Sequence, residues 1–203
     1  MRDAHSSLHV HAAEDPADVE DSHRRAGVAV IERFGRHGLL LPRTLLVPGV
    51  RLPEPELREA QAEGAWIVHC PRSNMNNAVG HAPTEAFRRA ALGTDGLDED
   101  MLSEARAAFL KMRDAGREDA LVAAFGLLVG GHRLAGAFFR LPFGKLDAGA
   151  PADLAVLDYS AADAPDRGEP GRPPPLRPRP QPRPLDDGGR ALRPARPEHH
   201  NGG

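Results

Sequence analysis

The chain has 203 residues, a formal net charge of -3 and 1 cysteine. This length allows one domain with a substantial core and excludes two large ones. The near-neutral charge gives no support for a nucleic-acid partner, and a single cysteine excludes an internal disulfide, so a reduced cytoplasmic setting is expected.

Export and membrane signals are not expected either. Residues 1–16 are charged and rich in histidine, without the apolar stretch of a signal peptide. No apolar run of the sequence is judged long enough to span a bilayer. The sequence therefore predicts a cytoplasmic protein that works away from membranes.

Strand and helix patterns alternate along the first 159 residues. The predicted strands are short and apolar: Leu8–Ala12, Thr44–Val50, Ala65–Cys70, Ala91–Gly96 and Ala152–Tyr159. The predicted helices carry apolar residues at helical spacing: Asp21–Gly38, Leu52–Gly64, Thr84–Ala90, Glu99–Gly116 and Arg117–Phe139. The polar segment Pro71–Pro83 is predicted to be a loop.

This alternation is typical of a parallel α/β sheet, either doubly wound or a (β/α)8 barrel. Polar residues follow the ends of three strands, in the segments His11–Glu14, Arg72–Asn77 and Thr94–Asp95. In a barrel, the rim at the carboxyl ends of the strands is where active sites are built. A complete barrel needs about 250 residues, so the sequence predicts a partial barrel.

Composition changes sharply after Tyr159. From Ser160 onward the chain contains 11 of its 20 prolines, with few apolar residues, so residues 160–203 are predicted to be a disordered Pro/Arg-rich tail. The tail is interpreted as a linker or SH3-type ligand, as a segment without a function of its own, which we favour, or as a misread frame. The predicted domain boundaries are therefore 1–159 and 160–203.

The stretch LHVHAAED, Leu8–Asp15, allows two interpretations. His9 and His11 are two residues apart and point to the same face of a strand, as a two-histidine metal site would require. In the second interpretation, one histidine ligates a metal and Glu14 transfers protons. The spacing alone leaves both open.

Four motifs together resemble the metal-dependent amidohydrolase superfamily. In chain order they are HVHAAED (9–15), VHCPRSNMNNAVG (68–80), LGTDGLDEDM (92–101) and GKLDAGAPADLAVLDY (144–159). The chain is most similar to the chlorohydrolase and aminohydrolase branch, and within it to SsnA-type aminohydrolases. The resemblance implies strands five to eight of a TIM-type barrel, followed by the remnant of a flanking β-strand segment.

The resemblance also implies roles for particular residues. His11 and Asp95 would ligate one divalent metal, zinc or iron, while Glu14 would shuttle protons and Asp95 would take a proton from the bound water. His9 would then be a bystander. The loop after strand seven would line the substrate pocket, and His69, Ser73 and Asn74 would be its substrate-binding residues.

Two departures from the family pattern put the chemistry in doubt. Strands one to four, which carry the histidine pair of the family's metal site, are missing from this sequence. In the segment Val47–Leu52, Pro48 stands where the histidine of strand six is expected. The metal site is therefore expected to be incomplete.

The sequence thus predicts a hydrolase of non-peptide carbon–nitrogen bonds, acting on a small N-heterocycle, in a truncated and impaired form. The alternative is a non-catalytic remnant or binding module from a broken gene. A half barrel with two unpaired edges also predicts a homodimer, pairing with a complementing N-terminal half, or poor solubility.

Overall fold

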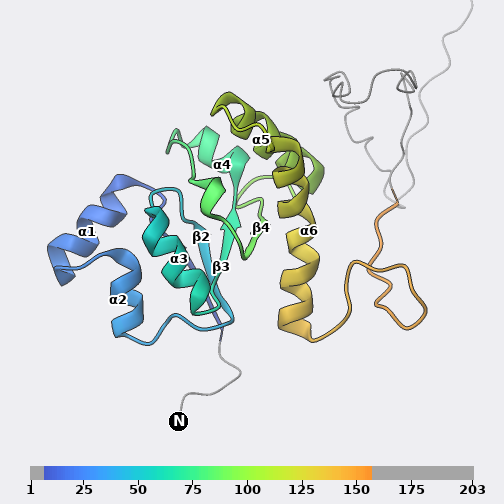
Figure 1. The fold of residues 1–203 in the computed structure, drawn as a ribbon, viewed down its shortest axis with the longest axis horizontal. Helices are drawn as coiled ribbons and strands as arrows, with labels where there is room; N and C mark the ends of the chain where they lie inside the picture. Colours follow the sequence, from blue (N-terminus) through green and yellow to red (C-terminus); the bar gives the residue numbers. More distant parts are fainter. Residues whose placement is uncertain (1–6, 157–203) are drawn as a thin grey trace, which may run out of the picture. The chain divides into compact units, whose positions relative to one another are not determined.

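The computed structural model describes residues 7–156 (Figure 1). The chain divides into two compact units, Met1–Leu154 and Ala155–Gly203, and all described helices and strands belong to the first. The predicted tail, residues 160–203, lies outside the described residues. The first unit is an α/β fold built on one parallel sheet.

The sheet has four strands in the order β1-β2-β3-β4. They are β1 (Leu8–Ala12), β2 (Thr44–Pro48), β3 (Trp66–His69) and β4 (Ala90–Leu92). The helices are α1 (Pro16–Ala26), α2 (Val30–Arg36), α3 (Glu54–Ala62), α4 (Pro71–Asn76), α5 (Met101–Asp114) and α6 (Ala120–Phe139), with a 3-10 turn at Thr84–Ala86. Every strand is followed by at least one helix, as a parallel sheet requires.

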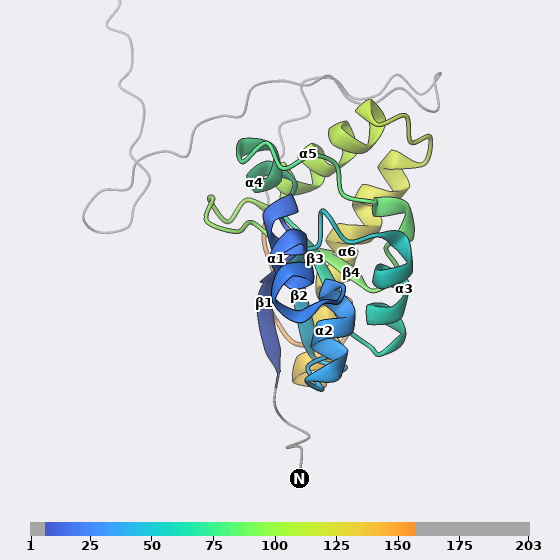
Figure 2. The same cartoon turned by 90° about the vertical axis from the view of Figure 1, so that its left-hand side faces the viewer.

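One face of the sheet packs against the helices, and this packing forms the core. Side chains of a strand alternate between the two faces. Leu46 and Ile67 point toward the helices and are fully buried against Ile31 of α2 and Leu57 of α3. Helices α1–α3 lie beside the first strands, whereas α5 and α6 lie beside β4 (Figures 1 and 2).

The opposite face of the sheet carries the two histidines of β1. In β1, His9 and His11 are exposed while their neighbours are more buried. Their register partners on β2 are Leu45 and Val47. The two histidines therefore do share one face, as their spacing predicts, and it is the face turned away from the helices.

Helix α6 covers the outer edge of β4. The backbone of Arg89 and Gly93 bonds to β3, so the carbonyl of Ala90 points away from β3, toward the edge. At Gly130 of α6, an added Cβ would lie 2.1 Å from that carbonyl oxygen, so helix and edge are in backbone contact. Among the described residues no strand pairs with this edge of β4, as predicted, but helix α6 shields it.

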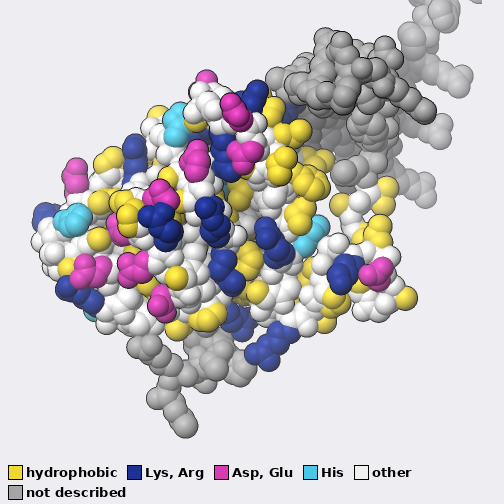
Figure 3. All heavy atoms as spheres, in the orientation of Figure 1, with side chains coloured by type: hydrophobic (Ala, Val, Ile, Leu, Met, Phe, Trp, Pro, Cys, Tyr) yellow, Lys and Arg dark blue, Asp and Glu magenta, His cyan; other side chains and the backbone are white. Residues whose placement is uncertain are grey.

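Helix α6 is also the most apolar element. By length and composition alone, α6 could cross a membrane, although the sequence analysis expected no such segment. Only 17% of its apolar stretch is buried in the structure. Leu121, Val122 and Phe125 are each more than 60% exposed. Hydrophobic side chains gather over this part of α6 in the space-filling view (Figure 3). Since α6 also packs on β4 and α5, its apolar composition is partly explained by the core.

The predicted elements match the structure except at four places. The helix predicted over Thr84–Ala90 is only a 3-10 turn at Thr84–Ala86, and Ala90 already belongs to β4. The helix predicted over Asp21–Gly38 is two helices, because Gly27 takes a left-handed conformation (φ 69°) and caps α1. The predicted loop after β3 begins with helix α4, which starts at Pro71. The strand predicted at Ala152–Tyr159 is absent from its described part, residues 152–156.

Candidate functional site

The carboxyl ends of β1 and β4 bring one histidine and two carboxylates together. His11 Nδ1 lies 3.8 Å from Glu14 Oε2, and His11 Nε2 lies 4.0 Å from Asp95 Oδ1. These three residues, the His11 cluster, come from the two outermost strands, so the sheet must curve strongly enough for its ends to converge. Convergence of strand ends at one rim is the geometry on which barrel active sites are built.

Two polar side chains of the α4 region hold the carboxylates in place. Ser73 Oγ donates a hydrogen bond of 2.6 Å to Asp95 Oδ2, and Asn77 Nδ2 donates one of 3.3 Å to Glu14 Oε1. Asp95 has φ 53°, a left-handed conformation that is strained for a residue with a Cβ. The hydrogen bond from Ser73 helps to maintain this conformation, which turns the carboxylate toward His11.

The start of α1 fixes the position of Glu14. Asp15 caps the helix by accepting a hydrogen bond from Ala17 N, and Asp18 accepts hydrogen bonds from the backbone N–H groups of Glu14 and Asp15. This capping box satisfies backbone donors that the helix itself leaves free. Ala13, just before it, takes φ 50° and turns the chain between strand and helix. Glu14 is thus tied to the end of β1 by local sequence.

An ion pair that was not predicted from the sequence anchors α4 to α5. Glu104 is fully buried, and its carboxylate accepts hydrogen bonds from Arg72 Nε at 2.6 Å and from Arg72 N at 3.2 Å. Arg72 also bonds Asp98, in the segment that follows Asp95. The hydrogen bonds that Arg72 donates to Asp98 and Glu104 raise the pKa of Arg72. The pair therefore couples the loop that carries Asp95 to the helix that carries Ser73.

Of the three residues predicted to contact substrate, Ser73 is the one that hydrogen-bonds to the His11 cluster, through Asp95. His69 is 2% exposed and packs edge-to-face on Phe87, with ring centroids 5.8 Å apart. Burial, and then the charge of Lys111, lower the pKa of His69 to about 4, so its imidazole is neutral at pH 7. Asn74 is fully buried. Substrate contact by His69 and Asn74 remains a prediction that their burial does not favour.

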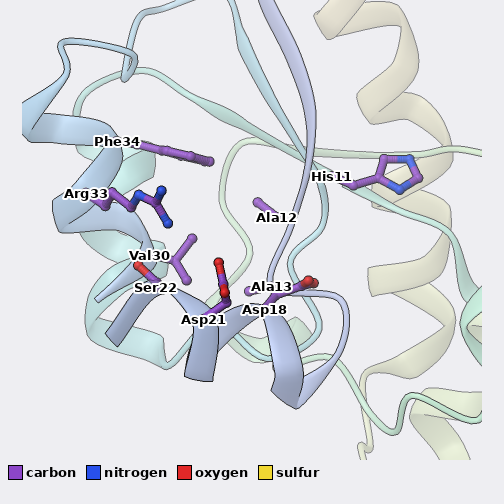
Figure 4. A pocket seen from close by; sticks show the side chains of 9 residues that line it. All are labelled: His11, Ala12, Ala13, Asp18, Asp21, Ser22, Val30, Arg33 and Phe34. Atoms are coloured by element: carbon purple, nitrogen blue, oxygen red, sulfur yellow. The ribbon is translucent and has the colours of Figure 1, made fainter. Parts of the chain in front are cut away.

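A pocket of about 220 Å³ borders the other side of β1 (Figure 4). Arg33 and Phe34 of α2 and Asp21 of α1 point into it, whereas Asp18 and His11 point away from these side chains (Figure 4). This pocket is therefore separate from the face on which His11 meets Glu14 and Asp95.

Comparison with known proteins bears on what this arrangement can do. The model of the Amidohydrolase family matches residues 1–183. The chain belongs to the amidohydrolase family. This agrees with the resemblance seen in the four sequence motifs, although no comparison tests the narrower likeness to SsnA-type aminohydrolases.

Relatives of this chain are named as deaminases. A 5-methylthioadenosine/S-adenosylhomocysteine deaminase of Halobacterium salinarum is 37% identical over 171 residues, which cover 79% of this chain and 39% of the relative. A relative with the same name from Teredinibacter turnerae is 32% identical and covers 78% of this chain and 38% of the relative. The chain thus spans about two fifths of the length of these relatives.

Solved structures share the amidohydrolase fold. An adenosine deaminase from Xanthomonas campestris with bound zinc matches with a TM-score of 0.58 at 30% identity, covering 65% of this chain and 33% of that one. An amidohydrolase from Brucella melitensis matches with a TM-score of 0.59 at 24% identity, covering 72% of this chain and 35% of that one. A divalent metal thus accompanies the fold in a neighbour.

The residues that could hold such a metal here are only part of a set. His11 and Asp95, the two predicted ligands, do approach each other. Within residues 7–156, however, no group of three or more His, Cys, Asp or Glu side chains could hold a metal ion. The residues of β2 that are paired with His11 and Ala12 are Val47 and Pro48, and their side chains have no atom that can ligate a metal. Because a catalytic zinc normally has three protein ligands, the described residues do not fit a complete site.

Proposed function

We propose that this chain carries one part of an amidohydrolase active site, for the hydrolytic deamination of an amino-substituted N-heterocycle. The single observation that carries the proposal is the convergence of His11, Glu14 and Asp95 at the carboxyl ends of β1 and β4. The names of the relatives support the reaction class, and a 5′-thio-substituted adenosine is the substrate that they suggest.

Glu14 is proposed to protonate the leaving nitrogen as a general acid, which requires a carboxyl group within hydrogen-bond reach of it. Asp95 is proposed to accept a proton from the attacking water. The proton would go to Oδ1, because Oδ2 already accepts the hydrogen bond from Ser73. Amidohydrolase chemistry also uses a metal that generates hydroxide at neutral pH. Among residues 7–156, only His11 and Asp95 of the predicted ligands come together to bind that metal, which is fewer than a catalytic zinc needs.

We further propose that β1–β4 correspond to strands five to eight of the barrel. The other four strands would come from a complementing N-terminal half or from a second copy of this chain. By this proposal, the chain is cytoplasmic. Without the other half of the barrel it has little or no activity. A small-molecule substrate would bind only where both halves of the rim are present.

Complementation tests the proposed function. The chain would be co-purified with the N-terminal part of the Halobacterium salinarum deaminase, and ammonia release from 5-methylthioadenosine would be followed with added zinc. We expect release by the complex, none by either part alone, and a loss of at least 100-fold in Glu14→Gln, because general acid–base catalysis contributes about 100- to 10,000-fold. Equal rates for wild type and Glu14→Gln would contradict the assigned role, and a stable but inactive complex would contradict the function.

A second candidate function is a non-catalytic binding module or remnant. The incomplete ligand set among the described residues and Pro48 at the end of β2 favour it. In that case the complex would form and bind 5-methylthioadenosine without releasing ammonia. Binding and turnover measured on the same sample therefore separate the two candidates.

A further inference from the structure

A second, larger pocket lies between α4 with its following loop and α5. Its volume is about 450 Å³, and its lining includes Asn74, Met75, His81, Leu110, Lys111 and Asp114. This volume is within the range that holds small organic ligands. None of these lining residues belongs to the His11 cluster, and Asn74 is the one among them that was predicted to contact substrate.

Asn74 is the buried polar residue in the lining of this pocket. Its side chain is fully buried, and neither Nδ2 nor Oδ1 has a hydrogen-bond partner in the structure. A buried amide with both atoms unpaired is costly, so native proteins rarely keep one without a partner. The side-chain amide offers one donor and one acceptor next to each other, which matches a ligand edge with the same pair in reverse.

Lys111 adds a cation to the lining of the pocket. The structure gives its ammonium no hydrogen bond or ion pair with another residue of the described range, and the carboxylate of Asp114 is the charge that raises its pKa. Burial acts more strongly and lowers the pKa of Lys111. The ammonium also lowers the pKa of buried His69, so its charge is felt on the inner side of the pocket.

The surroundings of the pocket favour an anion with an apolar body. His81 belongs to the lining, and the guanidinium of Arg51 lies against Gly80, 3.1 Å from where a Cβ would be. Met75 and Leu110 are 47% and 40% exposed and form an apolar rim. Because a methionine side chain is flexible, Met75 can adapt to the shape of a bound ligand.

We propose that this pocket binds a small heteroaromatic carboxylate that carries an adjacent N–H and C=O edge. The carboxylate would pair with Lys111, the edge would bond the amide of Asn74, and the ring would lie between Met75 and Leu110. Asn74 and Ser73 are neighbours on α4, so one turn of helix faces this pocket and the His11 cluster at once.

Orotate is a suitable probe, because it combines a carboxylate with an imide edge, and calorimetric titration of the full chain measures its binding. We expect saturable binding of one orotate per chain, at least 10-fold tighter than that of uracil, which lacks the carboxylate, or benzoate, which lacks the edge. Absence of saturable binding would overturn the site. Benzoate binding as tightly as orotate would overturn the assigned role of Asn74.

Variants locate the bound orotate. Lys111→Met should weaken binding at least 10-fold, whereas Lys145→Met, which removes the other lysine of the chain, and His11→Ala should leave it unchanged. Met75→Trp adds bulk at the exposed rim and should also weaken binding at least 10-fold, because the larger side chain fills the space for the ring. Unchanged binding in both Lys111→Met and Met75→Trp, or equal losses in Lys145→Met, would overturn the proposal.

Discussion

Ser73 and His69 illustrate how single residues of one motif take different roles in the fold. Both belong to the segment 68–80 that resembles the family, and both were predicted to meet substrate. Ser73 bonds the carboxylate of Asp95, whereas His69 is enclosed beside Phe87. The sequence could place them at the end of a strand, but which side chain turns to the rim depends on the helix that follows, and that helix was not predicted.

Removal of the Ser73 hydroxyl should destabilise the rim. Ser73→Ala deletes the 2.6 Å hydrogen bond that supports the strained Asp95, and a hydrogen bond to a charged group contributes roughly 1.5–3 kcal/mol. We therefore expect a loss of about 2 kcal/mol in the free energy of unfolding, measured with urea. The exposed Ser7→Ala is the control and should change stability by less than about 0.5 kcal/mol. Equal effects of the two substitutions would contradict the role of Ser73.

Burial of His69 predicts a specific pH dependence of stability. Its pKa falls from 6.5 to about 4 in the folded protein, so between these values the unfolded chain binds more protons. The contribution of His69 to stability is therefore complete above pH 6.5 and is lost as the pH falls toward 4, by about 2 kcal/mol at pH 5.

Urea unfolding at pH 7.5 and pH 5 measures this effect. His69→Phe should lose less stability between the two values than the wild type, because the titrating group is gone. The matched control is His81→Gln, at an exposed histidine, which should keep the wild-type difference. If His69→Phe lost as much free energy of unfolding between pH 7.5 and pH 5 as the wild type does, carboxylates alone would cause the acid sensitivity.

Elements were predictable where pattern and propensity agreed, and less so where one residue decided the outcome. All four strands of the described sheet were found from apolar runs at nearly the right bounds. The break at Gly27 and the start of α4 at Pro71 were missed, because a glycine or proline inside a mixed pattern fits several conformations. The contact of α6 with the edge of β4 depends on tertiary packing, which local patterns do not contain.

Gly130 tests that contact. In Gly130→Ala, the new Cβ would meet the carbonyl oxygen of Ala90, so α6 must move away from β4, and overpacking of this kind costs typically 1–3 kcal/mol. Gly131→Ala is a matched control on the next residue, where an added Cβ meets nothing within 4 Å. It should be neutral or stabilise by up to about 1 kcal/mol through helix propensity. Equal thermal stability of the two variants would contradict the close packing.

At the scale of the whole molecule, the chain is an α/β fold whose rim gathers some residues of an amidohydrolase site. Family membership and the approach of His11, Glu14 and Asp95 were accessible from four ordered motifs. Arg72 and Asn77 lie in a polar segment that was predicted at the rim. Their bonds to Glu104 and Glu14 were not predicted, because no single-residue pattern marks a contact between distant side chains. The pairing of the chain with a complementing half remains a proposal.

Zinc content of the purified chain, after dialysis against metal-free buffer, tests the central claim most directly. Since His11 and Asp95 are the only predicted ligands brought together among residues 7–156, we predict far less than one zinc per chain, unchanged in His11→Ala. Addition of the complementing half should raise the content toward one zinc, and His11→Ala should then lower it. One zinc per chain without a partner, lost in His11→Ala, would contradict the claim that the site is incomplete.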